Sequence, residues 1–203
     1  MIKAGITGGI GSGKTTVCKL WESLGARVVY ADDLAKKLMT EDDQLKKQIK
    51  NVFGDKAYHG DGSLNREYLS DVAFRKGRVE ELNALVHPAV YKKTDELMRE
   101  AEKEGVTLFV KEAALLLKNG RPPGFDVIIM VVADEDNRVE WVTARDNTDS
   151  DSVTDRINNQ QDFGKLHSMA DIVIENRGSR KELLVKAESL YNQLIESDQH
   201  RDF

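Results

Sequence analysis

The chain has 203 residues, of which 40% are hydrophobic, which is enough for one folded core with small insertions. Lys and Arg total 30 against 35 Asp and Glu, and this slightly acidic balance argues against nucleic-acid binding. No run approaches the roughly 18 apolar residues of a membrane-spanning helix, and Cys18, the single cysteine, excludes a disulfide within the chain. We therefore expect a cytoplasmic protein that binds neither nucleic acid nor membrane.

The first predicted elements are a strand over residues 2–6, a glycine-rich loop and a helix that ends before Gly25. Residues 8–15 read GGIGSGKT and fit the pattern G-x-x-x-x-G-K-[ST] in the strand–loop–helix context that this motif requires. Glycines let backbone N–H groups converge on phosphate oxygens at the positive end of the helix. Lys14 would reach the β- and γ-phosphates, and the Thr15 hydroxyl would ligate Mg²⁺. The loop predicts a nucleoside triphosphate site, but ATPases, GTPases and kinases share it.

Four more short apolar runs follow along the chain. They cover residues 27–31, 107–110, 127–132 and 172–174. Near-continuous apolar runs of this length are typical of strands buried on both faces of a parallel sheet. Helical segments separate the runs, and the last helix opens with a capping box of Ser179 and Glu182. The pattern predicts an α/β fold with a doubly wound, five-stranded parallel sheet.

One segment, residues 62–105, interrupts the alternation because it contains no strand. A helical stripe runs from Val90 to Ala101. Pro88 precedes this stripe at a position that suits the first turn of a helix. The segment is predicted to be an all-helical insertion.

A second interruption covers residues 138–168. Its polar run at 147–152 predicts a loop and a helix cap. Guanidinium donors stabilise the charge that spreads over the γ-phosphoryl oxygens during transfer, so the arginines of this segment are candidates for that role. We interpret Arg138 and Arg156 as residues of a solvated helix face.

Asp32 and Asp33 directly follow the second predicted strand, where the carboxyl ends of parallel strands face the ligand crevice. An aspartate has a pKa of about 4 and is a weak base for a sugar hydroxyl. Phosphoryl transfer has a loose transition state, however, and needs little early deprotonation. Local sequence supports a catalytic role and a helix N-cap role equally, with Asp32 the first choice as the base. His87, next to Pro88, is by itself more typical of a structural residue.

Several short motifs occur in a fixed order. Residues 5–15 read GITGGIGSGKT, Ala31-Asp32 follows the second strand, residues 82–88 fit LN-x-x-x-HP, Arg145 precedes Asp146, Gln160 follows, and residues 170–176 read ADIVIEN. Together they resemble the dephospho-CoA kinase family, the last enzyme of coenzyme A biosynthesis, over nearly the whole chain.

The resemblance implies ATP-dependent phosphorylation of the 3′-hydroxyl of the ribose of dephospho-CoA, with Mg²⁺ as cofactor. It implies a P-loop fold like that of nucleoside monophosphate kinases. The parts would be a nucleotide-binding core (1–61, 106–137 and 169–203), a helical CoA-binding insertion (62–105) and a mobile lid (138–168).

The resemblance also assigns roles to residues. Asp32 is the candidate base, Lys14 and Arg145 complete the catalytic set, and Thr15 is the metal ligand. The substrate-binding residues are Asp32, His87 and Leu115. The ATP-binding residues are Gly9, Ile10, Gly11, Ser12, Gly13, Lys14, Thr15, Thr16 and Asn176.

Four positions depart from the family pattern. They are Tyr30 and Lys118, where many members have an acid, Ala114, where they have proline, and Trp141, where they often have arginine. The change at Trp141 removes one phosphate contact, for which Arg138, one turn earlier, is the candidate substitute. Glu112 is the candidate for the acidity lost elsewhere.

The alternative is a P-loop kinase of the same architecture that phosphorylates another nucleoside or nucleotide. The helical insertion decides between the two, because it would hold the pantetheine-bearing acceptor. A GTPase switch predicts a guanine-selecting N-K-x-D, which the sequence lacks. A binding module without catalysis finds support only in the departures at Tyr30, Lys118 and Trp141. Nothing in the sequence indicates the oligomeric state.

Overall fold

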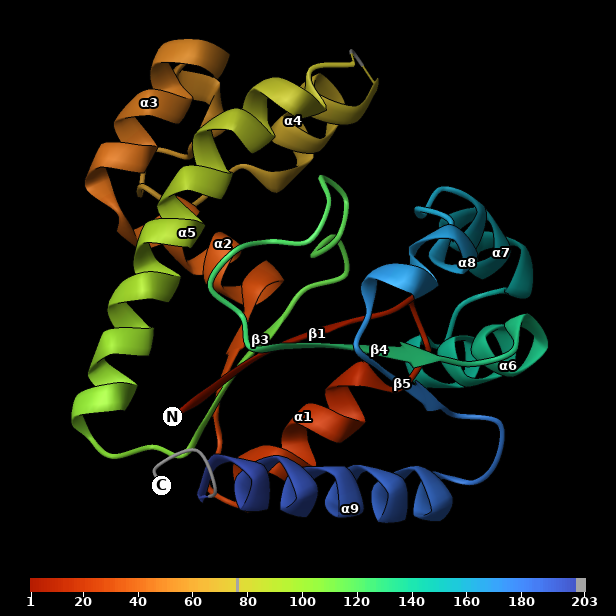
Figure 1. The fold of residues 1–203 in the computed structure, drawn as a ribbon. Helices are drawn as coiled ribbons and strands as arrows, with labels where there is room; N and C mark the ends of the chain where they lie inside the picture. The colour runs from red at the N-terminus through yellow and green to blue at the C-terminus, as the bar shows by residue number, and fades with distance from the viewer. Residues whose placement is uncertain (76, 200–203) are drawn as a thin grey trace. The chain divides into compact units, whose positions relative to one another are not determined.

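The sheet of the computed structural model, which describes residues 1–75 and 77–199, has the strand order β2-β3-β1-β4-β5 (Figure 1). The strands are β1 (Ile2–Thr7), β2 (Arg27–Tyr30), β3 (Leu108–Glu112), β4 (Val127–Val132) and β5 (Ile172–Glu175). β1 pairs in parallel with β3 and β4, and β4 pairs in parallel with β5. The predicted five-stranded parallel sheet is confirmed. Because β1 is the central strand, its carboxyl end delivers the glycine loop to the middle of the sheet.

Helices connect the strands in the described part of the chain. They are α1 (Lys14–Ser23), α2 (Ala31–Glu41), α3 (Asp43–Phe53), α4 (Arg66–Ser70), α5 (Val79–Lys103), α6 (Glu135–Asp146), α7 (Ser150–Asn158), α8 (Phe163–Leu166) and α9 (Arg180–Gln199). Short 3-10 turns cover Asp55–Ala57 and His167–Met169, and a π turn covers Asp71–Arg75. Among these described helices none combines the length and the apolar content needed to cross a membrane. Residue 76 of the predicted insertion and residues 200–203 of the predicted core lie outside the described residues.

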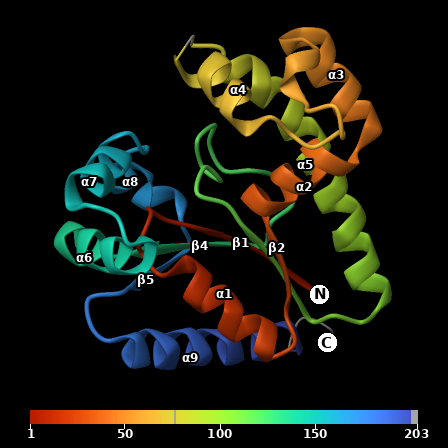
Figure 2. The ribbon, with the colours of Figure 1, turned by 180° about the vertical axis from the view of Figure 1, so that it is seen from behind.

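α1 and α9 pack together on one side of the sheet (Figures 1 and 2). Val17, Cys18 and Trp21 of α1 are fully buried. The Trp21 indole N–H donates to the carbonyl of Ala187 in α9 at 2.8 Å, which fixes the two helices against each other. Burial also raises the pKa of the Cys18 thiol well above its usual range. Cys18 is therefore a small apolar core residue.

The turn that follows β3 and helix α8 pack against β4 and β5. Leu117, Ile128 and Met130 are fully buried there, with Phe163 and Leu166 of α8 beside them. α8 lies on the other side of the sheet from α9 (Figure 1). The sheet is thus covered on both sides, which explains why β4 is buried along nearly its whole length.

By its internal contacts the chain divides into two compact units, one of residues 1–29 with 100 onward and one of Tyr30–Arg99. The second unit is helical and has its own core. That core includes Leu45, Ile49, Phe53, Val86 and Val90. The unit starts at Tyr30 rather than at residue 62, because α2 and α3 pack with α5 in this core. The assignment of the parts as substrate insertion and lid stays a prediction.

The predicted start of the helix around Pro88 is wrong. α5 begins at Val79, and Pro88 lies inside it. A proline in a helix interior removes one backbone hydrogen bond and costs about 3 kcal/mol. Val86 and Val90, on either side of Pro88, are both buried in the core of the second unit. The burial of a continuous apolar stripe offsets the free energy of the lost hydrogen bond, so the helix continues on both sides of Pro88.

Candidate active site

The loop between β1 and α1 adopts a conformation that requires glycine, for example at Gly13 and Gly8. Gly13, directly before α1, has φ 104°, and a Cβ there would lie 2.7 Å from Leu183 Cδ2 and 2.8 Å from Asn176 Nδ2. Gly8 has φ 146°, and a Cβ there would collide with the backbone of β4. The first helical bond joins the Val17 N–H to the Gly13 carbonyl at 3.1 Å. The N–H groups of the first turn and the positive end of α1 therefore face the loop.

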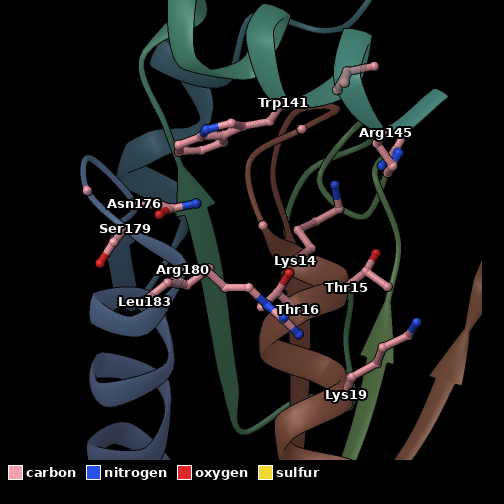
Figure 3. A pocket seen from close by; sticks show the side chains of 14 residues that line it. Lys14, Thr15, Thr16, Lys19, Trp141, Arg145, Asn176, Ser179, Arg180 and Leu183 are labelled. Carbon is pink, nitrogen blue, oxygen red and sulfur yellow. The ribbon is translucent and has the colours of Figure 1, made fainter. Parts of the chain in front are cut away.

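The loop and the first turn of α1 form one wall of a pocket of about 660 Å³ (Figure 3). Helix α6, the connection after β5 and the start of α9 form the others. The lining residues are Gly11, Gly13, Lys14, Thr15, Thr16, Lys19, Trp141, Val142, Arg145, Asn176, Gly178, Ser179, Arg180 and Leu183. Four of them are cationic and none carries a carboxylate, and we call this site the cationic pocket. Such a lining suits a polyanion at the positive end of a helix.

Seven of the predicted site residues meet in this pocket. They are Gly11, Gly13, Lys14, Thr15, Thr16, Arg145 and Asn176. Gly9 and Ser12 instead line a second pocket, of about 580 Å³, together with Arg138 and Gln160. The side chain of Ile10 packs among apolar residues of α6 and α7.

Lys14 is buried at the start of α1. Its ammonium group donates to the carbonyls of Gly8 and Gly9 at 2.9 and 3.0 Å. The carboxylate of Glu112, at the end of β3, lies 3.7 Å from the same nitrogen. Glu112 is only 8% exposed, so each of the two buried charges offsets the other. The ammonium is held at the loop by groups that a phosphate oxygen can replace.

Arg145, in the last turn of α6, reaches into the cationic pocket (Figure 3). Its Nε and Nη2 donate to the two carboxylate oxygens of Asp146 at 2.7 and 3.0 Å. Arg156 donates to the same carboxylate at 3.1 Å. The hydrogen bond from Arg145, followed by that from Arg156, lowers the pKa of Asp146 to about 2, and Asp146 in turn raises the pKa of Arg145. The Arg156 side chain is exposed, so it lies on a solvated helix face as the sequence predicts.

Arg138 does not lie on a solvated helix face, and that interpretation of the sequence is wrong. Its Nε donates to the Ile10 carbonyl at 2.8 Å, and its Nη2 donates to Gln160 Oε1 at 3.2 Å. The same Gln160 oxygen accepts the Ile10 N–H at 2.8 Å. Arg138 and Gln160 together bond both backbone groups of Ile10. Burial of this guanidinium against the loop lowers the pKa of Arg138.

Asp32 lies in the first turn of α2 and is exposed. The N-cap of α2 is Tyr30, and no side chain caps the helix, so the N-cap role for Asp32 or Asp33 is wrong. Asp33 pairs with Lys36 at 2.8 Å. Acids in a first turn still favour the helix through its dipole. Asp32 belongs to the second unit, and its part in catalysis stays a prediction.

His87 and Leu115 lie outside the cationic pocket. His87 is in α5, where its ring meets that of Tyr91 edge to face with centroids 6.5 Å apart. Leu115 is on the turn after β3 and remains 48% exposed. An exposed leucine there is available to a ligand, and both residues stay predicted substrate contacts.

Comparison with known proteins places the chain in a family. A family model described as dephospho-CoA kinase matches residues 2–182. The chain belongs to the dephospho-CoA kinase family. The dephospho-CoA kinase of Salinibacter ruber is 47% identical over 192 residues, which cover 94% of this chain and 96% of that relative. The dephospho-CoA kinase of Thermobifida fusca is 36% identical over 195 residues, 96% of each chain.

Solved structures agree with the dephospho-CoA kinase fold. A protein of Thermus thermophilus has a TM-score of 0.77 at 31% identity, and the match covers 95% of this chain and 97% of that one. A dephospho-CoA kinase from Campylobacter jejuni has a TM-score of 0.64 at 22% identity, with 95% and 96% covered. The fold of this family member is therefore that of a P-loop kinase sheet with flanking helices.

Two positions at which this chain departs from the dephospho-CoA kinase pattern have defined surroundings. The carbonyl of Ala114 accepts hydrogen bonds from Thr7 Oγ1 at 3.2 Å and from Gln161 Nε2 at 2.7 Å. Trp141 lies on the wall of the cationic pocket. A backbone carbonyl does not depend on its own side chain, so alanine in place of proline leaves the contacts at position 114 intact.

Other pocket residues have no binding role in the sequence-based prediction. Lys19 and Arg180 add charge, and Ser179 accepts a hydrogen bond from the Glu182 N–H at 3.3 Å as the predicted helix cap. The one sequence signal for Arg180 is its place four residues after Asn176, at the start of a helix that follows a sheet strand. No signal marks Lys19, because a lysine on an amphipathic helix is usually solvated.

Proposed function

We propose that this protein transfers the γ-phosphoryl group of ATP to the 3′-hydroxyl of the ribose of dephospho-CoA, giving coenzyme A and ADP. The observation that carries the proposal is the cationic pocket over the glycine loop, in a chain that belongs to the dephospho-CoA kinase family. The pocket supplies the donor half of a two-substrate site. Membership of the dephospho-CoA kinase family indicates dephospho-CoA as the acceptor.

The donor half follows from the loop. The triphosphate of ATP would lie along the first turn of α1, where N–H groups and the helix dipole favour negative charge. Lys14 Nζ, now bonded to two loop carbonyls, would exchange them for β- and γ-phosphate oxygens. Arg145 would bind the γ-phosphoryl group from the α6 side of the same pocket.

The residues of the loop also fit Mg²⁺. Mg²⁺ keeps several waters and is held by one or two protein oxygens together with substrate phosphates. Thr15 lines the pocket as the predicted ligand. The Oε1 atom of Glu112 lies 3.7 Å from Lys14 Nζ, and a carboxylate at this position would suit the water shell of a cation. Among the described residues no group of three or more His, Cys, Asp or Glu side chains could hold a metal ion. When bound, the ion neutralises charge on the β- and γ-phosphates.

The transfer step uses the chain's own residues in three roles. The 3′-oxygen of the ribose forms a bond to the γ-phosphorus while the bond to the β,γ-bridging oxygen breaks, and ADP leaves. Asp32 orients the hydroxyl and accepts its proton late in the step. Lys14 and Arg145 stabilise the charge on the transferring oxygens.

A coupled assay of ADP release tests this proposal. With Mg²⁺ and ATP present, dephospho-CoA should stimulate ADP release far above the rate without acceptor. Adenosine and AMP, at the same concentration, should stimulate it much less. A stronger response to adenosine or AMP would favour the alternative kinase, and no response to any acceptor would sink the proposal.

A further inference from the structure

Helix α6 places an indole ring on the wall of the cationic pocket. Trp141 lines that pocket and is only partly buried. Within residues 1–75 and 77–199 its side chain makes no hydrogen bond and no aromatic contact. Tryptophan usually buries most of its surface and finds a partner for its N–H group. An open indole face beside a phosphate site therefore has the properties of a ligand contact.

Trp141 and Arg145 share one face of α6, one turn apart. The rise of four residues along a helix is about 6 Å. In Figure 3 the Arg145 side chain lies near Lys14, whereas Trp141 lies near Asn176, with Ser179 and Leu183 below. A triphosphate on Lys14 and Thr15 would thus direct its nucleoside toward Trp141. The spacing along α6 leaves room for a ribose between a base at Trp141 and a phosphate at Arg145.

Asn176, a polar side chain at this end of the pocket, already has a hydrogen-bond partner in the loop. Asn176 is buried, and its Nδ2 donates to the Ser12 carbonyl at 3.0 Å. The large apolar side chains of the lining include Trp141 on α6 and Leu183 on α9. Flat aromatic bases bind well to aromatic faces, and this stacking tolerates differences in base edge.

We propose that Trp141 stacks on the purine ring of ATP. This inference rests on the proposed use of ATP, and it changes the interpretation of position 141. The tryptophan that replaces an arginine in this chain does not leave a gap at the phosphates. It contacts the base, and the phosphates are bound by Lys14, Arg145 and the helix end.

Tryptophan fluorescence tests the inference directly, because the chain has two tryptophans and Trp21 is fully buried. Wild-type protein and Trp141→Phe should be titrated with ATP and with inorganic tripolyphosphate, while calorimetry records binding of each. ATP should change the emission of the wild type and leave that of Trp141→Phe nearly constant although it still binds. Tripolyphosphate should bind without a comparable change. An equal change with tripolyphosphate would overturn the inference, because the indole would then report events at the phosphates.

Affinities provide the second measurement. Trp141→Ala should raise the Kd of ATP about tenfold, the effect of losing one stacked base, and the Kd of tripolyphosphate less than twofold. Trp141→Phe, which keeps an aromatic face, should recover most of the ATP affinity. In turnover, the KM for ATP should rise more than kcat falls. An unchanged Kd for ATP in Trp141→Ala would overturn the inference while leaving the proposed kinase activity in place. Tight ATP binding through Trp141 without phosphorylation of dephospho-CoA would overturn the activity alone.

Discussion

Arg145 is charged and partly exposed, and Asp146 holds it by two hydrogen bonds. Because these bonds lower the pKa of Asp146 to about 2, the pair stays ionised throughout any ordinary assay range. Removal of a donor that acts on transition-state charge typically costs about 10²–10³ in rate. Arg145→Ala should therefore lower kcat by about that factor and change the Kd of ATP much less.

Arg156→Ala is the matched control for Arg145→Ala. Arg156 pairs with the same carboxylate but does not line the cationic pocket. Arg156→Ala should retain nearly full turnover in the coupled assay of ADP release. Equal losses of turnover and ATP affinity in Arg145→Ala would point to ground-state binding and contradict the assigned role.

Asp32 carries the acceptor chemistry in the proposed reaction. Asp32→Asn keeps the size of the side chain and removes its capacity to accept a proton. Turnover should fall about 10²-fold or more, whereas the Kd of ATP, measured by calorimetry, should stay near the parent value. Asp33→Asn is the control, because Asp33 pairs with Lys36 on the same helix turn. If Asp32→Asn kept parental turnover, Asp32 would not be the base.

Much of the donor site follows from residue types alone. The loop motif specifies Lys14, Thr15 and the positions of glycine, because close approach of backbone to phosphate requires them. The position of Arg138, in contrast, does not follow from residue type. An arginine near a helix start is usually solvated, and nothing local shows that the loop backbone of Ile10 lies within 2.8 Å of it. Contacts between residues 128 positions apart depend on the packing of whole elements.

At the scale of elements, α6 presents Arg138, Trp141 and Arg145 on one face at helical spacing. The first holds the loop and the other two line the pocket. Ile10 also packs with Val142 and the buried residues of α7. The first helix of the predicted lid therefore contacts the loop through Ile10. The backbone position of Ile10 and the orientation of α6 depend on each other for this reason.

A double-mutant cycle of Arg138→Ala and Gln160→Ala tests this tie. Each single change removes one of the two side chains that bond Ile10 and should lower the free energy of unfolding in urea by about 1 kcal/mol. The two should couple by about 0.5 kcal/mol or more, because they share one oxygen and one backbone residue. Both should also raise the Kd of ATP, since the loop loses its fixed shape. Strictly additive effects on stability and unchanged ATP affinity would contradict the role.

The elements themselves differ in how well the sequence predicts them. The five strands appear at the predicted positions to within about two residues, because buried parallel strands leave continuous apolar runs. α5 differs, since its start at Val79 depends on packing that outweighs the proline inside it. Local rules treat Pro88 as a helix start, and only the buried neighbours Val86 and Val90 show otherwise.

For the whole molecule, the sequence predicts the α/β class and its parallel sheet, but not the boundary at Tyr30. The second compact unit exists because α3 and α5 share one core although residues 54–78 separate them, and such pairing leaves no local signature. The cationic pocket consists of residues of the first unit, whereas Asp32 and His87 belong to the second, which has its own core.

The most direct test of the proposed reaction is the identity of its product. Purified protein should be incubated with ATP, Mg²⁺ and dephospho-CoA, and the product analysed by mass spectrometry and phosphorus NMR, with Lys14→Ala as the control. The proposed reaction should give one new phosphate monoester on the 3′-oxygen of the ribose, which is coenzyme A, formed in step with ADP and absent with the control. A phosphate at any other position, or ADP without phosphorylated acceptor, would contradict it.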